Sequence, residues 1–108
     1  MKNSIFVRNN SVLERIHQED IHFIQAEGNY CIINTMGGRK YAVKISLTHF
    51  ANKLDSYDFA QVHRGYIVRL SLIETIDTVN GNLIAGGTEF PLGRKFRDRL
   101  LKEKLLVI

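Results

Sequence analysis

Three short polar segments, each beside an apolar run, carry the side chains of this sequence that could do chemistry. They are Glu27-Gly28-Asn29-Tyr30, His63-Arg64-Gly65 and Gly93-Arg94-Lys95. An arginine guanidinium can fork onto a phosphate or a guanine edge. A glycine at a turn is free to take φ > 0. We therefore expect three loop tips, held by strands, that together form an anion-binding surface.

A nucleic acid is one anion that these side chains could bind. Arg64 and Arg94 can each bond a base edge or a phosphate, and the Asn29 amide can do the same. Lys44 and Ser46 precede a predicted helix, where a phosphate would fit. Binding would come from loops, because the sequence contains no helix-turn-helix pair, zinc finger or aromatic RNA-recognition strand.

Other interpretations remain open at this point. His63 can donate to a phosphate, or it can bond only to a neighbouring carbonyl of its own tip. A single-stranded DNA or RNA binder of the small β-barrel type would need exposed aromatic side chains, for which Tyr30 and Tyr66 are the candidates. A protein-interaction module could use an exposed sheet edge near Pro91.

The sequence does not favour an enzyme or a metalloprotein. The four histidines are scattered, and none has metal-ligand spacing to another histidine, a cysteine or an acid. No nucleophile elbow, phosphate-binding loop or dinucleotide-binding motif occurs. Cys31 is the one cysteine and lies in an apolar run, so we expect a small buried thiol. We predict no catalytic residue, no metal and no cofactor.

Length and composition favour one domain over residues 1–108. Hydrophobic residues make up 44% and charged residues 24%, which is ordinary for a soluble globular chain. No apolar run is long enough to cross a membrane, and no signal peptide follows the first residues. We therefore expect a cytoplasmic protein without a membrane partner.

The formal net charge of +4 is concentrated near the end of the chain. The cations there are Arg94, Lys95, Arg97, Arg99, Lys102 and Lys104. Such a cluster is compatible with an anionic partner, but it is also what the solvated face of a terminal helix looks like.

Apolar periodicity predicts a mainly β protein with about nine or ten short strands and two short helices. Strands are expected over residues 5–7, 12–16, 21–26, 30–35, 39–45, 59–62, 66–70, 72–79, 82–85 and 88–90, and helices after Ser46 and over residues 94–106. We expect residues 21–45 to form a meander. Simple alternation places Ile21, Phe23 and Gln25 on one face of their strand.

Two further expectations concern the second half of the chain. Asn80-Gly81 predicts a two-residue hairpin turn. The last helix is expected to pack down its apolar residues, which are Phe96, Leu100, Leu101, Leu105 and Leu106.

Four segments resemble, in order, the motifs of the LytTR DNA-binding domain, the output module of LytR/AlgR-type bacterial response regulators. Residues 59–70 resemble its signature, with Val62-His63-Arg64 followed by Tyr66-Ile67-Val68. Residues 20–30, 41–47 and 90–96 resemble the flanking motifs. The match extends over about residues 5–106, and four motifs in register are far more specific than any one of them.

The resemblance implies an elongated fold of small antiparallel sheets whose loops enter the grooves of double-stranded DNA. Carried over by position, the first loop is Asn29-Tyr30, the central one His63-Arg64-Gly65, and the last Arg94-Lys95 with Arg97. Arg64 would then lie at or near the minor groove, and Arg94 at a major-groove edge together with Asn29 or Tyr30. Lys44, Lys95 and Arg97 would contact phosphates.

This sequence departs from the family pattern at four positions. Gly65 and Gly93 stand where serine is common, Arg69 stands where asparagine is common, and Gln25 stands where glutamate is common. These changes bear on the DNA sequence preference more than on the fold.

The function that follows is sequence-specific binding of double-stranded DNA by a bacterial transcriptional regulator, or by the output domain of a two-component response regulator. Family members often occupy paired direct repeats, so we expect two copies on one operator. A receiver domain commonly precedes this module in the family, and the sequence has none; it could be a stand-alone regulator or part of a longer one.

Overall fold

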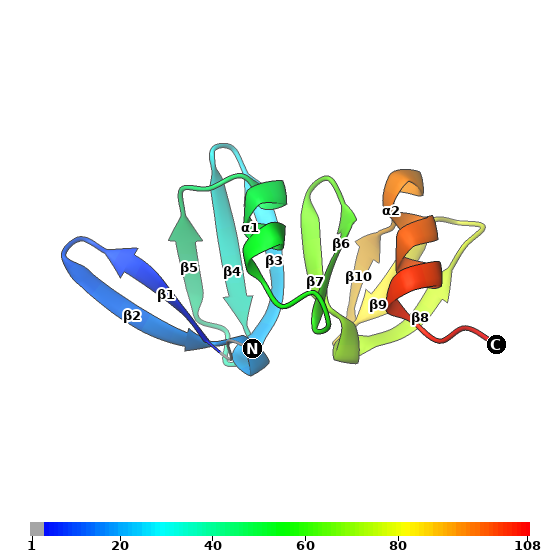
Figure 1. Ribbon diagram of the computed structural model, residues 1–108, viewed down its shortest axis with the longest axis horizontal. Helices are drawn as coiled ribbons and strands as arrows, with labels where there is room; N and C mark the ends of the chain where they lie inside the picture. The colour runs from blue at the N-terminus through cyan, green and yellow to red at the C-terminus, as the bar shows by residue number, and fades with distance from the viewer. Residues whose placement is uncertain (1–3) are drawn as a thin grey trace.

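The computed structural model describes residues 4–108, which form an elongated molecule of 47 × 28 × 23 Å (Figure 1). Within this range there are ten strands in three antiparallel sheets, and two α-helices, as the periodicity predicted. The strands are β1 (Ser4–Asn9), β2 (Val12–His17), β3 (Ile21–Glu27), β4 (Tyr30–Thr35), β5 (Lys40–Val43), β6 (Phe59–His63), β7 (Tyr66–Arg69), β8 (Ile73–Asp77), β9 (Asn82–Ala85) and β10 (Thr88–Pro91). The helices are α1 (Leu47–Lys53) and α2 (Arg94–Arg99).

The central sheet has five strands in the order β5-β4-β3-β7-β6. Its first half is the predicted meander, and the β6–β7 hairpin joins it because β7 pairs with β3. Ile67 and Val68 are neighbours on β7, and both are fully buried, in two different apolar clusters. Because neighbouring residues of a strand point to opposite faces, apolar side chains cover this sheet on both sides.

The alternation predicted for β3 is wrong at Ile21. The register of the β3–β4 pair shifts between Ile21 and Phe23, so a bulge interrupts the period of two. Ile21 and Ile24 consequently lie in the same buried cluster, whereas Phe23 packs against the other cluster.

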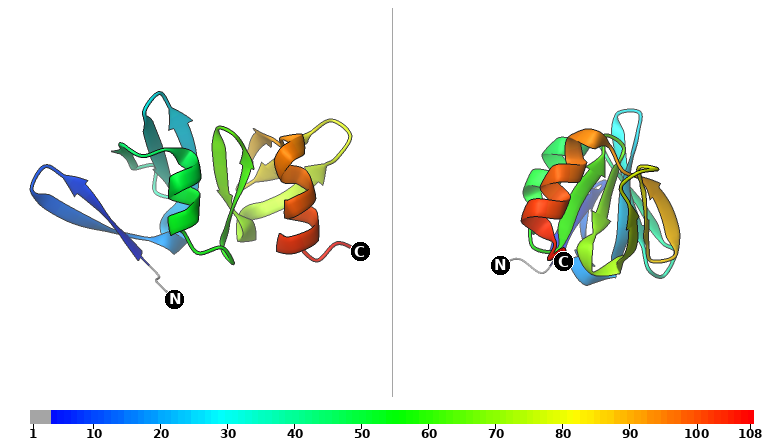
Figure 2. Two further views of the ribbon diagram at one scale, coloured as in Figure 1. Left: turned by 45° about the horizontal axis from the view of Figure 1, so that its top comes forward. Right: turned by 90° about the vertical axis from the view of Figure 1, so that its right-hand side faces the viewer.

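Helix α1 begins and packs as its sequence predicts. The Ser46 hydroxyl oxygen accepts a hydrogen bond from the His49 N–H at 3.2 Å and so caps the first turn. Leu47, Phe50 and Leu54 are buried on one face of the helix. The end-on view of Figure 2 shows α1 and α2 on the same side of the strands.

The third sheet, β8-β9-β10, contains two turns, one of which differs from the prediction. Gly86 and Gly87 join β9 to β10, and both have positive φ. The turn between β8 and β9 has four residues, because Asp77 pairs with Asn82. The two-residue turn expected at Asn80-Gly81 is therefore wrong. The Asp77 carboxylate accepts from the backbone N–H groups of Val79 and Asn80 and from the Asn80 amide, and these bonds favour the longer loop.

The last helix is shorter than predicted. After α2 the chain makes a π-helical turn over Leu100–Lys104, and Leu105 is extended. Leu100 is buried and Leu105 packs beside it, but Leu106 is 91% exposed. The expectation that Leu106 packs down is therefore wrong, because the helical period has ended before it.

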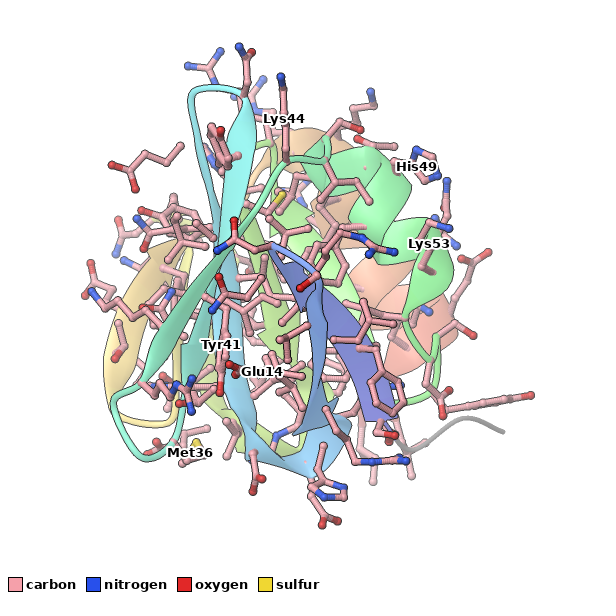
Figure 3. All side chains as sticks on the ribbon, turned by 90° about the vertical axis from the view of Figure 1, so that its left-hand side faces the viewer. Glu14, Met36, Tyr41, Lys44, His49 and Lys53 are labelled. Atoms are coloured by element: carbon pink, nitrogen blue, oxygen red, sulfur yellow. The ribbon has the colours of Figure 1, made fainter. Side chains whose placement is uncertain are left out.

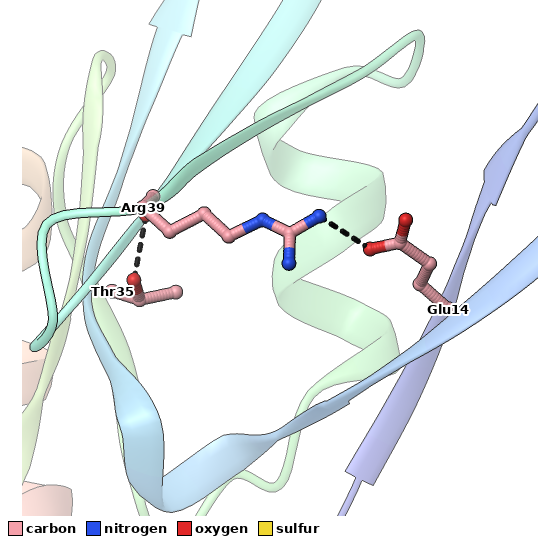
Figure 4. A network of polar contacts seen from close by, with 3 residues as sticks. All are labelled: Glu14, Thr35 and Arg39. Atoms are coloured by element: carbon pink, nitrogen blue, oxygen red, sulfur yellow. Dashed lines mark hydrogen bonds and ion pairs between the residues drawn. The ribbon is translucent and has the colours of Figure 1, made fainter.

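The β1–β2 hairpin forms an arm at one end of the molecule (Figure 1). A bond between the Arg39 guanidinium and the Glu14 carboxylate, 2.8 Å long, links the arm to the turn before β5 (Figure 4). The Arg39 backbone carbonyl accepts from the Thr35 hydroxyl at 2.6 Å, which fixes that turn. Among residues 4–108 there is no helix of the length and apolarity that a membrane span requires.

Candidate nucleic-acid interface

The three predicted tips lie on one side of the elongated molecule. In Figure 1 the β3–β4 turn, the β6–β7 turn and the start of α2 all lie along the upper side. The two further views in Figure 2 agree with this placement. Loops that are far apart in the sequence thus form a row along the long axis.

Two backbone hydrogen bonds join the tips to one another. The Ala26 N–H, at the end of β3, donates to the Gly65 carbonyl at 2.9 Å. The Gly93 N–H, just before α2, donates to the Val62 carbonyl at 2.8 Å. The central tip is therefore fixed on both sides, and the spacing of the three tips is set by strand geometry rather than by flexible side chains.

The first tip and the segment before α1 enclose a hollow of about 500 Å³. Gly28 makes the turn with φ of +59°, which presents Asn29 to solvent, and Tyr30 is 46% exposed. Lys44 lies beside this tip, as the end-on view in Figure 3 shows. Five of the predicted site residues line the hollow, namely Asn29, Tyr30, Lys44, Ser46 and Arg64.

The central tip is braced by its own histidine. The Gly65 N–H donates to His63 Nδ1 at 3.0 Å, and the Gln61 amide donates to the His63 carbonyl at 3.2 Å. His63 Nδ1 therefore acts as an acceptor, and its bracing partner is a backbone N–H rather than the carbonyl considered from the sequence. Gly65 does not use its freedom to take positive φ. Arg64 is exposed at the apex.

The third tip is the first turn of α2, where Arg94 and Lys95 are both exposed. The Lys95 ammonium lies 5.9 Å from the centre of the Phe96 ring. Arg97 is more constrained, because its guanidinium donates to the Thr78 carbonyl at 3.5 Å and lies 3.7 Å from the Asp98 carboxylate. Arg97 therefore connects α2 to the β8–β9 loop, and its guanidinium is less available to a ligand than the side chains of Arg94 and Lys95.

The comparison with protein families matches residues 11–105 to the family described as the LytTr DNA-binding domain. The chain belongs to the LytTR family. A solved structure, the LytTr DNA-binding domain of a putative methyl-accepting/DNA response regulator from Bacillus cereus, has the same fold with a TM-score of 0.75. It is 19% identical in sequence, and the alignment covers 93% of this chain and 94% of that one. A search of curated protein sequences finds no match.

Two positions at which this LytTR domain departs from the family motifs have structural roles. The Arg69 guanidinium donates to the Glu19 carbonyl, in the short turn between β2 and β3, so Arg69 braces the end of the sheet away from the tips. Gly93 precedes α2 in an extended conformation, and a Cβ added there would lie 3.2 Å from the Phe96 ring. The glycine therefore permits close packing of that ring.

Thr48 was not among the site residues predicted from the sequence. This residue lies in the first turn of α1, is exposed, and lines the same hollow as Lys44 and Ser46. Its position two residues after the capping serine could have identified it. The Ser46 oxygen is already engaged by the His49 N–H, so the hydroxyl of Thr48 adds a donor to this side of the LytTR domain.

The remaining candidate groups of this LytTR domain lie away from the tips or are buried. Cys31 is fully buried, its thiol donates to the Ile45 carbonyl at 3.1 Å, and burial raises its pKa. In the part of the chain that the structure describes, no histidine, cysteine, aspartate and glutamate side chains gather as they would around a metal ion.

Proposed function

We propose that this LytTR domain binds double-stranded DNA sequence-specifically, with its three tips in the grooves. The observation that supports this most strongly is the row of tips on one side, fixed by the Ala26–Gly65 and Val62–Gly93 hydrogen bonds. The molecule is 47 Å long, which exceeds one turn of B-DNA, about 34–36 Å. A row of this length can reach successive grooves on one face of a duplex.

The side chains at the tips divide into base-reading and phosphate-binding roles. Arg64 projects from the apex of the central hairpin and enters the minor groove, where a guanidinium is attracted by the negative potential. Asn29 and Arg94, on either side of it, reach major-groove edges. Lys44 and Lys95 bind phosphates and set the orientation of the domain.

The other predicted residues support these contacts. His63 holds Gly65 and so fixes the direction of Arg64. Tyr30 packs its ring against the sugar-phosphate backbone beside Asn29. The Ser46 hydroxyl proton is free to donate to a phosphate, because its oxygen is the atom that caps α1. Arg97 adds a weaker phosphate contact, since the Thr78 carbonyl and Asp98 already hold its guanidinium.

The biological role that fits this chemistry is regulation of transcription in the bacterial cytoplasm, as the output domain of a response regulator or as a stand-alone regulator. Each domain presents its reading groups asymmetrically along one axis. Because members of the family often occupy paired direct repeats, we expect two copies to bind such a pair on the same operator.

The test is a selection of bound duplexes from a random pool with the purified protein. We expect enrichment of one motif that occurs twice in the same orientation, and a stoichiometry of two proteins on each full site. Failure to enrich any duplex, or a stronger preference for RNA or single-stranded DNA over duplex, would overturn the proposal. A single half-site would overturn the pairing alone.

A further inference from the structure

A second hollow lies between the two helices, and Lys95 of the third tip is among the residues that line it. It has a volume of about 450 Å³ and opens between α1 and α2, above β6. Its floor includes Phe59, Ala60 and Leu100, all of them buried core side chains. We call it the interhelical cleft. Its volume lies in the range of sites that hold small ligands, about 300–1,000 Å³.

Cations from the end of the chain line one wall of the interhelical cleft. Lys95, Arg99 and Lys104 all contribute to this wall, and among residues 4–108 no carboxylate lines the cleft. The Lys104 ammonium donates to the Ser56 carbonyl at 2.7 Å and closes one end of the cleft. Arg99 also bonds Glu103 at 3.1 Å, at an exposed position where such a pair contributes little.

Burial changes the pKa of one of these cations, Lys104. Desolvation lowers the pKa of Lys104, and the neighbouring Arg99 lowers it further, whereas Glu103 and Asp55 act in the opposite direction. Arg99 and Lys104 therefore repel one another beside an apolar floor, and Glu103 and Asp55 offset part of this repulsion. An anion placed between them would reduce that repulsion.

We propose that the interhelical cleft binds a small amphipathic anion, with an apolar body on the floor and one carboxylate or sulfonate against Lys95 and Arg99. An apolar ligand without a charge would leave the cationic wall unpaired. An inorganic anion would leave the apolar floor uncovered. The combination of an apolar floor and a cationic wall selects a ligand that has both parts.

Binding in the cleft has a consequence that rests on the proposed function. Lys95 lies both in the third tip and in the cleft wall. A ligand acid group that engages Lys95 withdraws it from DNA phosphate. Ligand and DNA therefore weaken each other's binding, by the same factor in both directions.

The first experiment uses the protein without DNA. Decanoate is titrated into ¹⁵N-labelled protein, with decanol as the uncharged control, and amide shifts are followed. We expect saturable shifts for decanoate centred on Ala51, Ala60 and Leu100, and much weaker binding of decanol. Arg99→Gln should weaken decanoate binding about tenfold, as loss of one charge-assisted contact does, and leave decanol unchanged. Lys102→Gln, an exposed change in the same segment, is the matched control.

A filling variant tests the location independently. Ala51→Leu places a larger apolar side chain in the cleft from α1 and should abolish decanoate binding, with the fold checked by its amide spectrum. Equal binding of decanoate and decanol, shifts elsewhere in the molecule, or binding unaffected by both Arg99→Gln and Ala51→Leu would overturn the proposal.

The second experiment adds duplex DNA. Saturating decanoate should lower duplex affinity in the native protein and not in Ala51→Leu. Because the first experiment contains no DNA, failure of the cleft to bind ligand and failure of the tips to bind DNA are separate outcomes. Decanoate binding without any effect on DNA affinity would overturn the coupling through Lys95.

Discussion

The Gly93 N–H donates to the Val62 carbonyl at 2.8 Å, and this bond joins the start of α2 to the strand that leads into the central tip. Val62 is fully buried, so the bond is shielded from water. Gly93 is the residue immediately before Arg94. The backbone that carries Arg94 is thereby attached to β6, and the third tip is held beside the central one.

Arg94→Ala should selectively weaken binding to the operator. If Arg94 bonds a base edge, we expect a loss of about 1–3 kcal/mol of specific affinity and a smaller loss on scrambled duplex. Anisotropy titrations with both duplexes measure the difference. Arg8→Ala, an exposed arginine on the β1–β2 arm, is the matched control and should change neither affinity. An equal loss on both duplexes would show that Arg94 contacts only the backbone.

Salt should weaken DNA binding steeply. With about five phosphates neutralised by the tip cations, the slope of log affinity against log salt concentration should be about −4 to −5. Lys44→Gln or Lys95→Gln should each reduce the magnitude of the slope by about one. A flat salt titration of the native protein would remove the electrostatic part of the proposal.

Gly86 and Gly87 are two adjacent positions at which alanine substitutions should lower the unfolding free energy by different amounts. Both have positive φ, so alanine at either position should cost about 1–2 kcal/mol of unfolding free energy. A Cβ at Gly86 would also lie 2.5 Å from His22 Nε2, while Gly87 has open space. Gly86→Ala must therefore displace the His22 ring and break its 3.2 Å bond to the Ala85 carbonyl, at a further cost of about 0.5–1.5 kcal/mol. Equal denaturant midpoints for the two variants would contradict this.

Asp77 should make the free energy of unfolding depend on pH in the acid range. The Asn80 backbone N–H, the Asn80 amide and the Val79 N–H lower the Asp77 pKa, and together they outweigh the opposite effect of desolvation. The unfolded chain therefore binds the proton more tightly. The contribution of Asp77 to stability is present above the ordinary aspartate pKa, about 3.9, and is lost as pH falls through the lower folded value.

Urea unfolding at neutral pH and at about pH 3 measures this effect. Asp77→Asn should lower stability at neutral pH and should flatten the acid dependence. Glu89→Gln, which removes an exposed carboxylate from β10, is the control. If Asp77→Asn retains the full acid dependence, the loop bonds do not cause it.

Much of the fold could be predicted because its signals are local. The strand expected within residues 39–45 and the helix expected after Ser46 can each be recognised from a few neighbouring residues, and the structure confirms both. The errors have causes that composition does not reveal. The bulge beside Ile21 depends on how β3 pairs with β4, and the bonds from Val79 and Asn80 to Asp77 favour a longer loop than the Asn80-Gly81 pattern predicts.

Less of the candidate site than of the fold could be predicted from the sequence. The pattern identified the three tips, but their placement on one side follows from the pairing of β3 with β7, between residues more than forty positions apart. The bond between His63 Nδ1 and Gly65 depends on a side-chain orientation that no spacing rule gives. Thr48 was missed because its one sequence signal is its position two residues after the capping serine, and that position does not distinguish a binding residue from an ordinary helical one.

The most direct test of the account is an amide-shift map of the ¹⁵N-labelled protein titrated with a short duplex at low salt. The predicted result is a set of shifts at the three tips, including Asn29, Arg64 and Arg94, with little change at the Met36 turn or in the β1–β2 arm. Shifts concentrated on the Met36 side of the sheet, or at one tip alone, would contradict the claim that the row of tips is the DNA-binding surface.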